Sequence, residues 1–494
     1  MNDSISTSTD PSAVPKNSAM AAAAGSDDDP YTLSEQDRML IDGMVPLFIF
    51  YKMPSHVNDR QLVIDSMQRG LDTAAEQLPP LAAKMHLDDM GRPLRHTSPA
   101  GPLKLHVRVF DPGEFPSYDE LAQRSFSPGD VRSPSLIPDE MAANPSPSPR
   151  ERRICFVQLN FVPGDGVILM IAFSHMAADV TSMSLATSLI CKCTKAYMEG
   201  TLVPQHTYSY DRRPFLPKTE VVAAHTKEQL IAANDKHQTL KIIDSATAAP
   251  NKKKKQDTNC RRLVYRMTAS DAKALKDLCK PIGDVEYVST YDCIFGLLLR
   301  VLMRIRSSTS ANTSASEFMQ IKECKLVQAL NLRARKIIPT NYFGCGLVCG
   351  ATKPLSVDHL LGPDGLSLAA SSIRSSVMHD DHLSDLQMLM AVPAKLDPDR
   401  DERALVVPVG LPKDCLVATG WHGVDVANWD FGIGPPAMLR RREGPLSNVA
   451  YLYPDCQRAG VYDLDVYVYE EEQALLRKDA EFRRWFQVFD GARY

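Results

Sequence analysis

The arrangement of hydrophobic and polar positions between residues 154 and 200 predicts two strands followed by a helix. The apolar runs ICFVQLNF and VILMIAFSH are separated by PGDG, a turn sequence that contains glycine, so we expect two strands joined by a turn. The next segment, VTSMSLATSLICKCTKAYMEG, has the length of a helix and stops at Gly200. His175 therefore leaves the second strand, and His175 to Asp179 is a strand-to-helix turn.

Two further helical patterns stand in the second half of the chain. The segment STYDCIFGLLLRVLMRIR opens with Ser289 and Asp292 at the spacing of a capping box, and its apolar continuation predicts a core helix. Near the end of the chain, aromatic residues at helical spacing predict an amphipathic helix that packs onto the body: Phe482, Trp485, Phe486 and Phe489.

The chain shows no internal repeat, so we expect irregular α/β segments joined by polar loops. Residues 125–150 are rich in proline and serine, and residues 245–256 contain the lysine run Lys252 to Lys255. We interpret that run as a solvated linker rather than an import signal or an anion-binding patch. The predicted organisation is a disordered leader at 1–30, an N-terminal lobe at 31–215, a crossover linker at 216–258 and a C-terminal lobe at 259–494.

Composition and charge restrict the partners. A chain of 494 residues with 44% hydrophobic residues can bury a large core, in two domains or one two-lobed unit. The net charge of -4 gives no field that would gather nucleic acid or an anionic membrane. The first residues are acidic where a signal peptide is basic, and no segment approaches the roughly 20 apolar residues of a membrane span. We expect a cytoplasmic protein with neither nucleic acid nor membrane as a partner.

Cysteine and histidine spacing does not predict a metal centre. The chain has 11 cysteines, an odd number, and we expect reduced, buried thiols. Neither Cys191-x-Cys193 nor Cys345-x3-Cys349 has a second pair at zinc spacing, and no local motif supports a cysteine nucleophile. His379-Asp-Asp-His382 offers residue types that bind zinc, but it adjoins an amphipathic helical pattern, which favours a solvated polar end.

The segment IAFSHMAAD contains a candidate general base. Because His175 leaves a buried strand, the backbone holds it in place, as a base that must sit within ~3 Å of a substrate proton requires. Imidazole titrates near neutrality, so it can accept a proton and later release it. The alternative is a hydrogen-bonded core histidine at a strand end. Asp179 either bonds the ring or turns away and fixes the loop through a basic partner, and the spacing does not choose between these geometries.

A second motif lies far downstream, in TGWHGVDVANWDFGIGPP at residues 419–436. Asp430, Gly432 and Gly434 mark a tight turn there, and the two prolines that follow stop any helix. The histidine motif and this turn together carry more information than either does alone.

The pair His175-Met-Ala-Ala-Asp179 and Asp430-Phe-Gly-Ile-Gly434 resembles the H-x-x-x-D and D-F-G-x-G signatures of the plant and fungal CoA-dependent acyltransferases called the BAHD family. The order and the separation of the two motifs also match that family. The resemblance covers most of the chain from about residue 31, and further segments support it: YTLSEQDRML with LFIFYK, LPPLAAKMHLDDMGRPLRH, NLRAR at 331–335, NYFG at 341–344 and EEEQALLRKDAEFRRWF.

Two positions depart from the family pattern. Ile433 stands where the family usually has tryptophan, and Cys345 where asparagine often follows Y-F-G. The D-F-G-x-G turn is regarded in the family as mainly structural, which makes Ile433 tolerable. The insert around Ser307 to Ser316 and the acidic leader resemble divergent fungal members, such as those similar to trichothecene O-acetyltransferases.

The resemblance implies a mixed α/β fold of two similar lobes, like those of chloramphenicol acetyltransferase. Each lobe is then a mixed sheet flanked by helices, with an active-site channel between the lobes. It also implies acyl-CoA, in particular acetyl-CoA, as a co-substrate with no tightly bound cofactor, and a small alcohol of secondary metabolism as the acceptor. We expect the protein to act as a monomer.

The resemblance assigns roles to individual residues. His175 is expected to deprotonate the acceptor, which then attacks the thioester directly in a ternary complex. Trp421 is placed like a family residue whose indole N–H stabilises the oxyanion, with Thr419 assisting, although a buried core aromatic is an equal alternative for Trp421. Asp179 is expected to anchor its loop through an arginine, and the structural motif residues are Arg333 or Arg335, Asp430, Phe431, Gly432 and Gly434.

Other readings keep the fold and change the chemistry. Condensation domains and chloramphenicol acetyltransferases also use H-x-x-x-D, so N-acylation or amide formation is an alternative. The residues beside the motif are Ser174 and Val180, however, where condensation domains usually have histidine and glycine. A hydrolase that activates water and a non-catalytic ligand-binding homologue are further alternatives.

Overall fold

The predicted pair of strands and the helix that follows it are confirmed in the computed structural model. Strands β6 (Cys155–Val162) and β7 (Gly166–Ser174) are antiparallel, and helix α5 (Val180–Glu199) begins after Asp179 and ends at Gly200, whose φ of 64° is left-handed. The described residues are 33–40, 43–57, 59–87, 93–99, 101–142, 151–235, 240–243, 260–311, 321–379, 381–397, 402–406, 412–442 and 447–489. The predicted leader at 1–30 and the lysine run lie outside them.

The N-terminal lobe is built on a mixed sheet with the strand order β15-β1-β7-β6-β4. The neighbours of β6 and β7 in it are β1 (Met44–Lys52), β4 (Leu105–Val109) and β15 (Met438–Arg441). A smaller sheet in the same lobe pairs β2 (Ala83–Leu87) with β3 (Pro93–Pro99) and β5 (Glu151–Arg153). The other helices of this lobe are α1 (Glu35–Met39), α2 (Arg60–Gln77), α3 (Tyr118–Gln123) and α4 (Asp139–Ala142).

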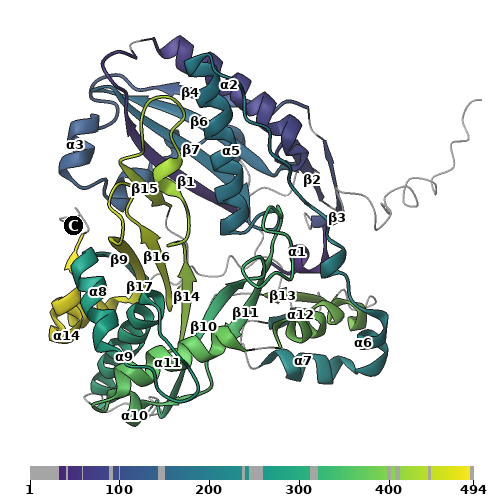
Figure 1. The fold of residues 1–494 in the computed structure, drawn as a ribbon, viewed down its shortest axis with the longest axis vertical. Coiled ribbons are helices and arrows are strands. Elements are labelled where there is room, and N and C mark those ends of the chain that lie inside the picture. The colour runs from purple at the N-terminus through teal and green to yellow at the C-terminus, as the bar shows by residue number, and fades with distance from the viewer. Residues whose placement is uncertain are drawn as a thin grey trace, which may run out of the picture.

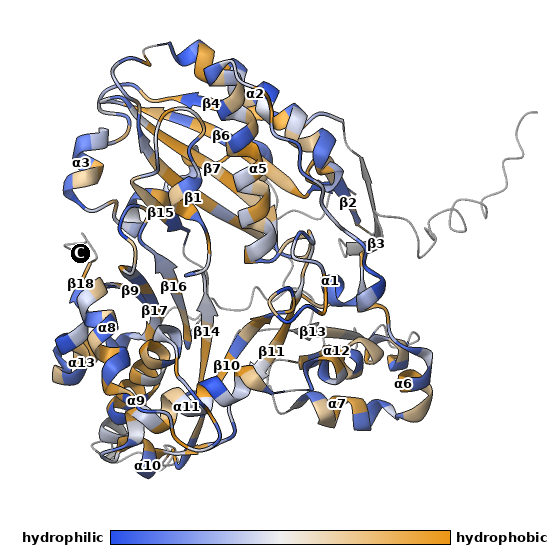
Figure 2. Ribbon diagram, viewed as in Figure 1, coloured by the Kyte–Doolittle hydropathy of each residue, from blue (hydrophilic) through white to orange (hydrophobic). Residues whose placement is uncertain are grey.

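Every residue of β6 and β7 is buried, because both faces of this sheet are covered. Helices α2 and α5 lie side by side on one face (Figure 1), and a second apolar cluster that includes Phe50, Phe126 and Ile168 covers the other face. Figure 2 shows these strands as a hydrophobic patch inside the lobe. The last residue of β7 is thus held in a rigid, buried frame.

The C-terminal lobe contains a second mixed sheet with the strand order β11-β10-β14-β16-β17-β9-β18, and β12 also pairs with β10. Its strands are β9 (Cys260–Met267), β10 (Glu323–Asn331), β11 (Leu347–Ala351), β12 (Leu355–Ser356), β14 (Cys415–Gly420), β16 (Val449–Pro454), β17 (Tyr462–Tyr469) and β18 (Gln487–Val488). Its helices are α8 (Ala269–Leu278), α9 (Thr290–Ala311), α10 (Val357–Leu361), α11 (Gly365–Met378), α13 (Glu470–Lys478) and α14 (Ala480–Trp485).

A small subdomain stands at one side of the C-terminal lobe (Figure 1). It pairs β8 (Leu240–Ile243) with β13 (Arg403–Val406) and packs α6 (Thr219–Ala224) and α7 (Lys227–Asp235) against α12 (His382–Ala391). Part of the predicted linker at 216–258 is therefore regular structure. The boundaries of the two lobes otherwise stay predictions.

Helix α9 confirms the capping box that its sequence predicts. Ser289 donates its N–H and its hydroxyl to Asp292, and the N–H of Asp292 returns a bond to Ser289 Oγ. The apolar side chains of α9, such as Phe295 and Leu299, fill the core between the helices and one face of the C-terminal sheet. The mixed α/β fold of two lobes follows the expectation from sequence.

One strand crosses between the lobes. Strand β15 follows the D-F-G-I-G turn in sequence but pairs with β1 in the N-terminal sheet, where Leu47 lies opposite Arg441. The predicted division of the chain at residues 216–258 does not account for this pairing, because it assigns β15 to the C-terminal lobe. The crossing places Arg441, from the second half of the chain, at the edge of the first lobe.

The aromatic helix predicted near the end of the chain is wrong in its length. Helix α14 ends at Trp485, and the next residues form β18, which pairs with β9. Phe482 and Trp485 are buried in the core as expected, whereas the N–H of Phe489 bonds the carbonyl of Val264 at 2.9 Å. Pairing with the open edge of β9 replaces the helical bonds that the spacing of the aromatic residues favours.

Candidate active site

The turn after β7 is held by backbone hydrogen bonds. The N–H of His175 donates to the carbonyl of Gly43 at 2.9 Å, and the N–H groups of Ala177 and Ala178 donate to Ser174 O at 3.0 and 3.1 Å. The side chain of His175 is half-buried, and its Nδ1 has no hydrogen-bond partner among the described residues. The imidazole is therefore positioned by its backbone and not by a neighbouring acid.

Burial is the largest cause that lowers the pKa of His175 below its ordinary value of 6.5. The ring's contact with the backbone of His175 itself raises this pKa, the positive charge of Arg441 lowers it further, and the negative charge of Asp179 raises it. The outcome is an imidazole that is neutral near pH 7 and can accept a proton.

Asp179 turns away from the imidazole and bonds the second half of the chain. Its Oδ2 accepts from Arg333 Nη1 at 2.7 Å and from the N–H of Gly346 at 2.8 Å, and its Oδ1 caps α5 by accepting from Ser182 N at 2.8 Å. Asp179 and Arg333 are each 3% exposed. The carboxylate is thus fully committed to an ion pair and two backbone N–H groups.

Arg333 is the arginine that pairs with Asp179, and Arg335 is not. Arg333 also donates to Ser182 Oγ at 2.8 Å and to the carbonyl of Tyr342 at 3.0 Å. Arg335 is half-buried, and it bonds the carbonyl oxygens of Asn331 and Val377, both at 3.0 Å. Position within NLRAR did not distinguish these two side chains.

Cys345, one of the two departures from the family pattern, lies directly behind the histidine turn. Its Sγ contacts the carbonyl of His175 at 3.1 Å and that of Met176 at 3.6 Å, and burial raises the pKa of the thiol well above its ordinary value. A protonated thiol donates weakly to carbonyl oxygens. Cys345 therefore helps to hold the C-terminal lobe against the turn that carries His175.

The D-F-G-I-G turn packs on the other end of helix α5. Asp430 Oδ1 accepts from the N–H groups of Gly432 and Gly434, both at 2.8 Å, and Oδ2 accepts from Lys195 Nζ at 2.6 Å. The two glycines have φ of 104° and 97°, which side chains with a Cβ rarely adopt. Burial raises the pKa of Asp430, but the bonds from Lys195 and the two N–H groups outweigh it and leave this pKa lowered.

The two other residues of this turn are buried apolar contacts. Phe431 meets Tyr51 edge to face with ring centroids 4.7 Å apart, and Ile433 is 2% exposed. Tyr51 in turn donates its hydroxyl to the carbonyl of Trp429 at 2.7 Å. A buried aliphatic side chain at Ile433 is compatible with the turn, as the sequence led us to expect.

Trp421 and Thr419 lie at the end of β14, on the face of the C-terminal sheet that turns toward the N-terminal lobe. Trp421 is 4% exposed, packs against Tyr453 with ring centroids 5.5 Å apart, and belongs to the core cluster shared by the two lobes. Its indole N–H is buried and has no acceptor among the described residues. The side chain is therefore a core aromatic that also retains an unused donor.

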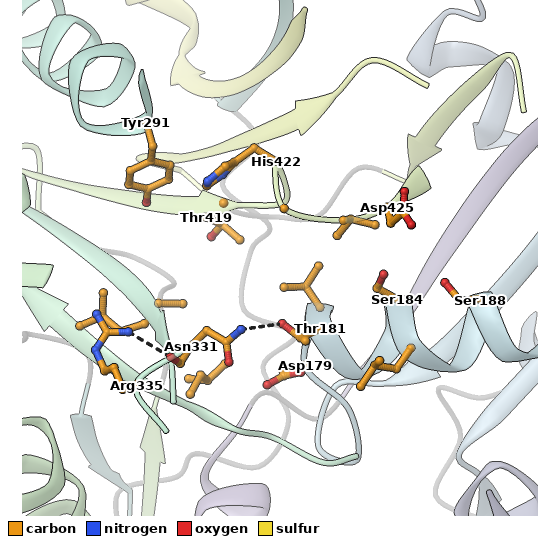
Figure 3. Close-up of a pocket in the computed structure, with 18 of the residues that line it drawn as sticks. Asp179, Thr181, Ser184, Ser188, Tyr291, Asn331, Arg335, Thr419, His422 and Asp425 are labelled. Atoms are coloured by element: carbon orange, nitrogen blue, oxygen red, sulfur yellow. Dashed lines mark hydrogen bonds between the residues drawn. The ribbon is translucent and has the colours of Figure 1, made fainter. Parts of the chain in front are cut away.

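A cavity of about 770 Å³ lies between the lobes and reaches the histidine turn at Asp179. Figure 3 shows Thr181, Ser184 and Ser188 on one side of it and Thr419 with His422 on the other. Neither His175 nor Trp421 is among its lining residues. The cavity has the size of a small-molecule site and ends next to the candidate base.

Half of the charged side chains that line this cavity form ion pairs with described residues. Asp292 binds Arg374 at 2.6 Å, and Asp179 binds Arg333. Lys192, exposed on α5, makes no ion pair with any residue that the structure describes. Groups of three or more histidine, cysteine or acidic residues that could hold a metal ion do not occur within the described ranges.

Apart from the arginine in NLRAR, the sequence did not indicate which residues bind Asp179, and it did not indicate the side chain that binds Asp430. Ser182 and Gly346 complete the bonds of Asp179, and Lys195 binds Asp430. Ser182 stands at the third position of α5, where a capping acceptor is expected to find a donor, so the helix start was a usable signal. No local pattern marks Lys195, because its partner lies in another part of the chain.

Comparison with known proteins decides the family. A model described as the Transferase family matches residues 125–482, which is more than half of the chain. The chain belongs to this family, the BAHD-type acyltransferases. A second model, the trichothecene 3-O-acetyltransferase-like N-terminal domain, matches residues 45–193. The protein is thus an acyltransferase.

Individual relatives agree with this assignment. The chain is 21% identical to the O-acetyltransferase pboB of Aspergillus ustus, over 92% of this chain and 96% of that protein. The crystal structure of F. graminearum TRI101 with coenzyme A and T-2 mycotoxin is similar in fold, with a TM-score of 0.73, 17% identity and coverage of 93% and 99%. The structure of vinorine synthase has a TM-score of 0.60, 16% identity and coverage of 93% and 94%.

No helix within the described ranges combines the length and the apolar character needed to cross a bilayer. The cytoplasmic location and the monomeric state stay predictions.

Proposed function

We propose that this acyltransferase moves an acyl group, in particular acetyl, from coenzyme A to a hydroxyl of a small secondary metabolite. The observation that carries the proposal is the histidine turn: Asp179 is fully occupied by Arg333 and backbone N–H groups, so the imidazole of His175 is held by its backbone and left available for proton transfer. The similarity to an O-acetyltransferase and to a structure bound to coenzyme A supports the choice of donor and acceptor.

The reaction needs one base and one donor for the oxyanion. His175 takes the proton of the acceptor hydroxyl while the oxygen attacks the thioester carbonyl carbon. The tetrahedral intermediate collapses, the C–S bond breaks, and the proton on His175 passes to the thiolate, which leaves as free thiol. Base assistance of this kind contributes about 10²- to 10⁴-fold in rate.

We assign the oxyanion to the indole N–H of Trp421, with Thr419 beside it. The unused, buried N–H supports this role, because proteins rarely leave such a donor unpaired. Trp421→Phe keeps the aromatic packing and removes the donor. Turnover should fall about 100-fold while the melting temperature stays close to wild type.

The cavity between the lobes is proposed to receive the acyl-CoA. Its position supports this, because it reaches Asp179 from one lobe and Thr419 from the other. Lys192 offers a positive charge to a phosphate at this site. Lys192→Glu should therefore raise the KM for acetyl-CoA and leave the KM for the acceptor unchanged.

The central test incubates the purified chain with acetyl-CoA and hydroxylated metabolites and follows both acetylated product and free acid by mass spectrometry. Acetylated product that disappears in His175→Ala supports the proposal. Free acid without an acceptor would indicate a hydrolase, amide products from amine acceptors would indicate N-acylation, and no turnover of any acyl-CoA would indicate a non-catalytic homologue. An unchanged rate in His175→Ala would overturn the assigned base.

A further inference from the structure

The face of the C-terminal sheet that turns toward the N-terminal lobe carries buried polar atoms without partners. Tyr453 and Tyr467 are 5% and 3% exposed, and neither hydroxyl has a hydrogen-bond partner among the described residues. The guanidinium of Arg441 adds Nε and Nη2, which are buried and unpaired as well. Folded proteins satisfy the great majority of such groups, so their concentration at one place points to a ligand.

This cluster adjoins the candidate base. Strands β15 and β7 both run antiparallel to β1, so they end at the same edge of the N-terminal sheet. Arg441 is the last residue of β15, and His175 directly follows the last residue of β7. The charge of Arg441 is felt at His175, where it lowers the pKa of the imidazole.

The cluster holds more positive than negative charge. Arg262 Nη2 donates to Asp465, and Arg262 Nη1 donates to the carbonyl of Arg441 at 2.9 Å. The guanidinium groups of Arg262 and Arg441 face a single carboxylate, that of Asp465, so one positive charge has no counter-ion. The ring of Tyr451, 4.0 Å from the guanidinium of Arg441, offsets only part of it. Buried charge without a counter-ion is costly, which favours an anionic ligand.

The free atoms also define the shape of that ligand. Nε and Nη2 lie along one edge of the planar guanidinium, and two N–H groups side by side match the two oxygens of a carboxylate. Burial raises the pKa of Tyr453 and of Tyr467, so both phenols stay protonated and can donate. Apart from Asp465 Oδ1, which is a buried acceptor, the unpaired groups of the cluster can therefore all donate to acceptor oxygens.

We propose that the acceptor substrate is a hydroxy acid: its carboxylate binds the Nε–Nη2 edge of Arg441 beside Tyr453 and Tyr467, and its hydroxyl meets His175. This inference rests on the proposed transfer to a hydroxyl and specifies the class of acceptor. Arg441 then determines specificity, because an ester or amide of the same compound lacks the second anionic oxygen. The donor enters from the cavity on the other side of the histidine turn.

Paired probes test the carboxylate directly. Isothermal titration of the full chain at pH 7 compares 4-hydroxybenzoate, 4-hydroxyphenylacetate and 3-hydroxybutyrate, each with its methyl ester. At least one acid should bind roughly tenfold more tightly than its ester. Arg441→Met should bring that ratio close to one, and Arg441→Lys, which keeps the charge and loses the fork, should give an intermediate ratio.

The matched control is Arg442→Met, at the next residue in sequence. The guanidinium of Arg442 lies outside the cluster and donates to the carbonyl of Arg132 at 2.6 Å. It should leave the preference for acids unchanged. Thermal unfolding checks that each variant is folded. Equal binding of every acid and its ester, no binding by any probe, or a preference that persists in Arg441→Met would each overturn the proposal.

The same titration in His175→Ala separates this inference from the proposed function. The acid should still be preferred there, because the anion site does not need the base. An acid preference that depends on Arg441 in a chain that shows no acyl transfer would remove the proposed function and keep the binding site. Acyl transfer to neutral alcohols without any preference for acids would do the reverse.

Discussion

The two ends of helix α5 are each held by an aspartate from a sequence motif, but the two attachments differ in depth. At the start of α5, Asp179 is buried and forms its ion pair with Arg333, which is equally buried. At the other end, Asp430 binds Lys195, whose side chain is 39% exposed. The buried attachment stands four residues from the candidate base, and the exposed one stands about four turns further along α5.

The difference in burial indicates that the two motifs contribute differently to stability and to turnover. An ion pair that is shielded from water loses much more when one partner is removed than an exposed pair does. We therefore expect substitutions at the start of α5 to lower both stability and turnover, and substitutions at its end to lower mainly stability.

The largest expected effect comes from removing the candidate base at the start of α5 while the ion pair of Asp179 stays in place. His175→Ala should lower turnover about 10²- to 10⁴-fold, because it removes the base and leaves the ion pair of Asp179 in place. Steady-state kinetics with acetyl-CoA measures this, and urea unfolding should give nearly wild-type stability. His225→Ala, remote from the turn, is the control. A stability loss as large as that of Asp179→Ala would mean that the histidine is a structural core residue.

The second effect breaks the buried attachment itself. Asp179→Ala should lower the free energy of unfolding by about 3–5 kcal/mol, because Arg333 is left as an unpaired buried charge. Turnover per folded molecule should fall as well, since the histidine turn loses its anchor. Asp463→Ala removes a carboxylate of similar burial that pairs with the buried Arg440 at 3.1 Å and with Arg266 at 2.7 Å. That control should lose similar stability and keep its turnover, and equal loss of turnover in both variants would contradict the comparison.

The third effect breaks the exposed attachment. Asp430→Ala leaves the N–H groups of Gly432 and Gly434 without their acceptor and should cost about 1–3 kcal/mol of unfolding free energy. Lys195→Met, which leaves those two bonds intact, should cost about 1 kcal/mol or less. Both are measured by urea unfolding, with turnover within about tenfold of wild type. A greater loss from Lys195→Met than from Asp430→Ala would show that the ion pair, and not the turn, holds this end.

The smallest effect concerns pH. The folded protein lowers the pKa of His175 below 6.5, so the unfolded chain binds the proton more readily and stability falls as the pH drops through 6.5. As the pH falls below 6.5, wild type should lose more unfolding free energy than His175→Ala does. The acid limb of kcat/KM should likewise have its midpoint below 6.5. A midpoint above that value would contradict the neutral imidazole.

Much of the fold around the site was predictable because it is encoded locally. Two apolar runs, a glycine turn and a capping residue marked β6, β7 and α5, and the capping box at Ser289 marked α9. The aromatic stripe at the end of the chain misled for the same reason: the spacing favours a helix, but residues 487–488 pair with the free edge of β9. Tertiary pairing overrode a local preference there.

The site itself was predictable only in part. The histidine and the glycines of the D-F-G-I-G turn could be named from their motifs, since their residue types carry the chemistry. The choice of Arg333 over Arg335 could not, because both stand in one short segment and only the chain path decides which faces Asp179. Arg441 left no signal at all, as its place beside His175 depends on the crossing of β15 into the other lobe.

The sequence by itself determined which segments are buried, where α5 begins and ends, and which side chains can accept or donate a proton. Those properties depend on neighbours within a few residues, where periodicity and capping act. Only the tertiary structure decided that Asp179 meets a side chain 154 residues away, and that unpaired donors from the second half of the chain gather beside a histidine from the first half. Such contacts depend on the packing of the two lobes and on the pairing of β15 with β1, which no local pattern predicts.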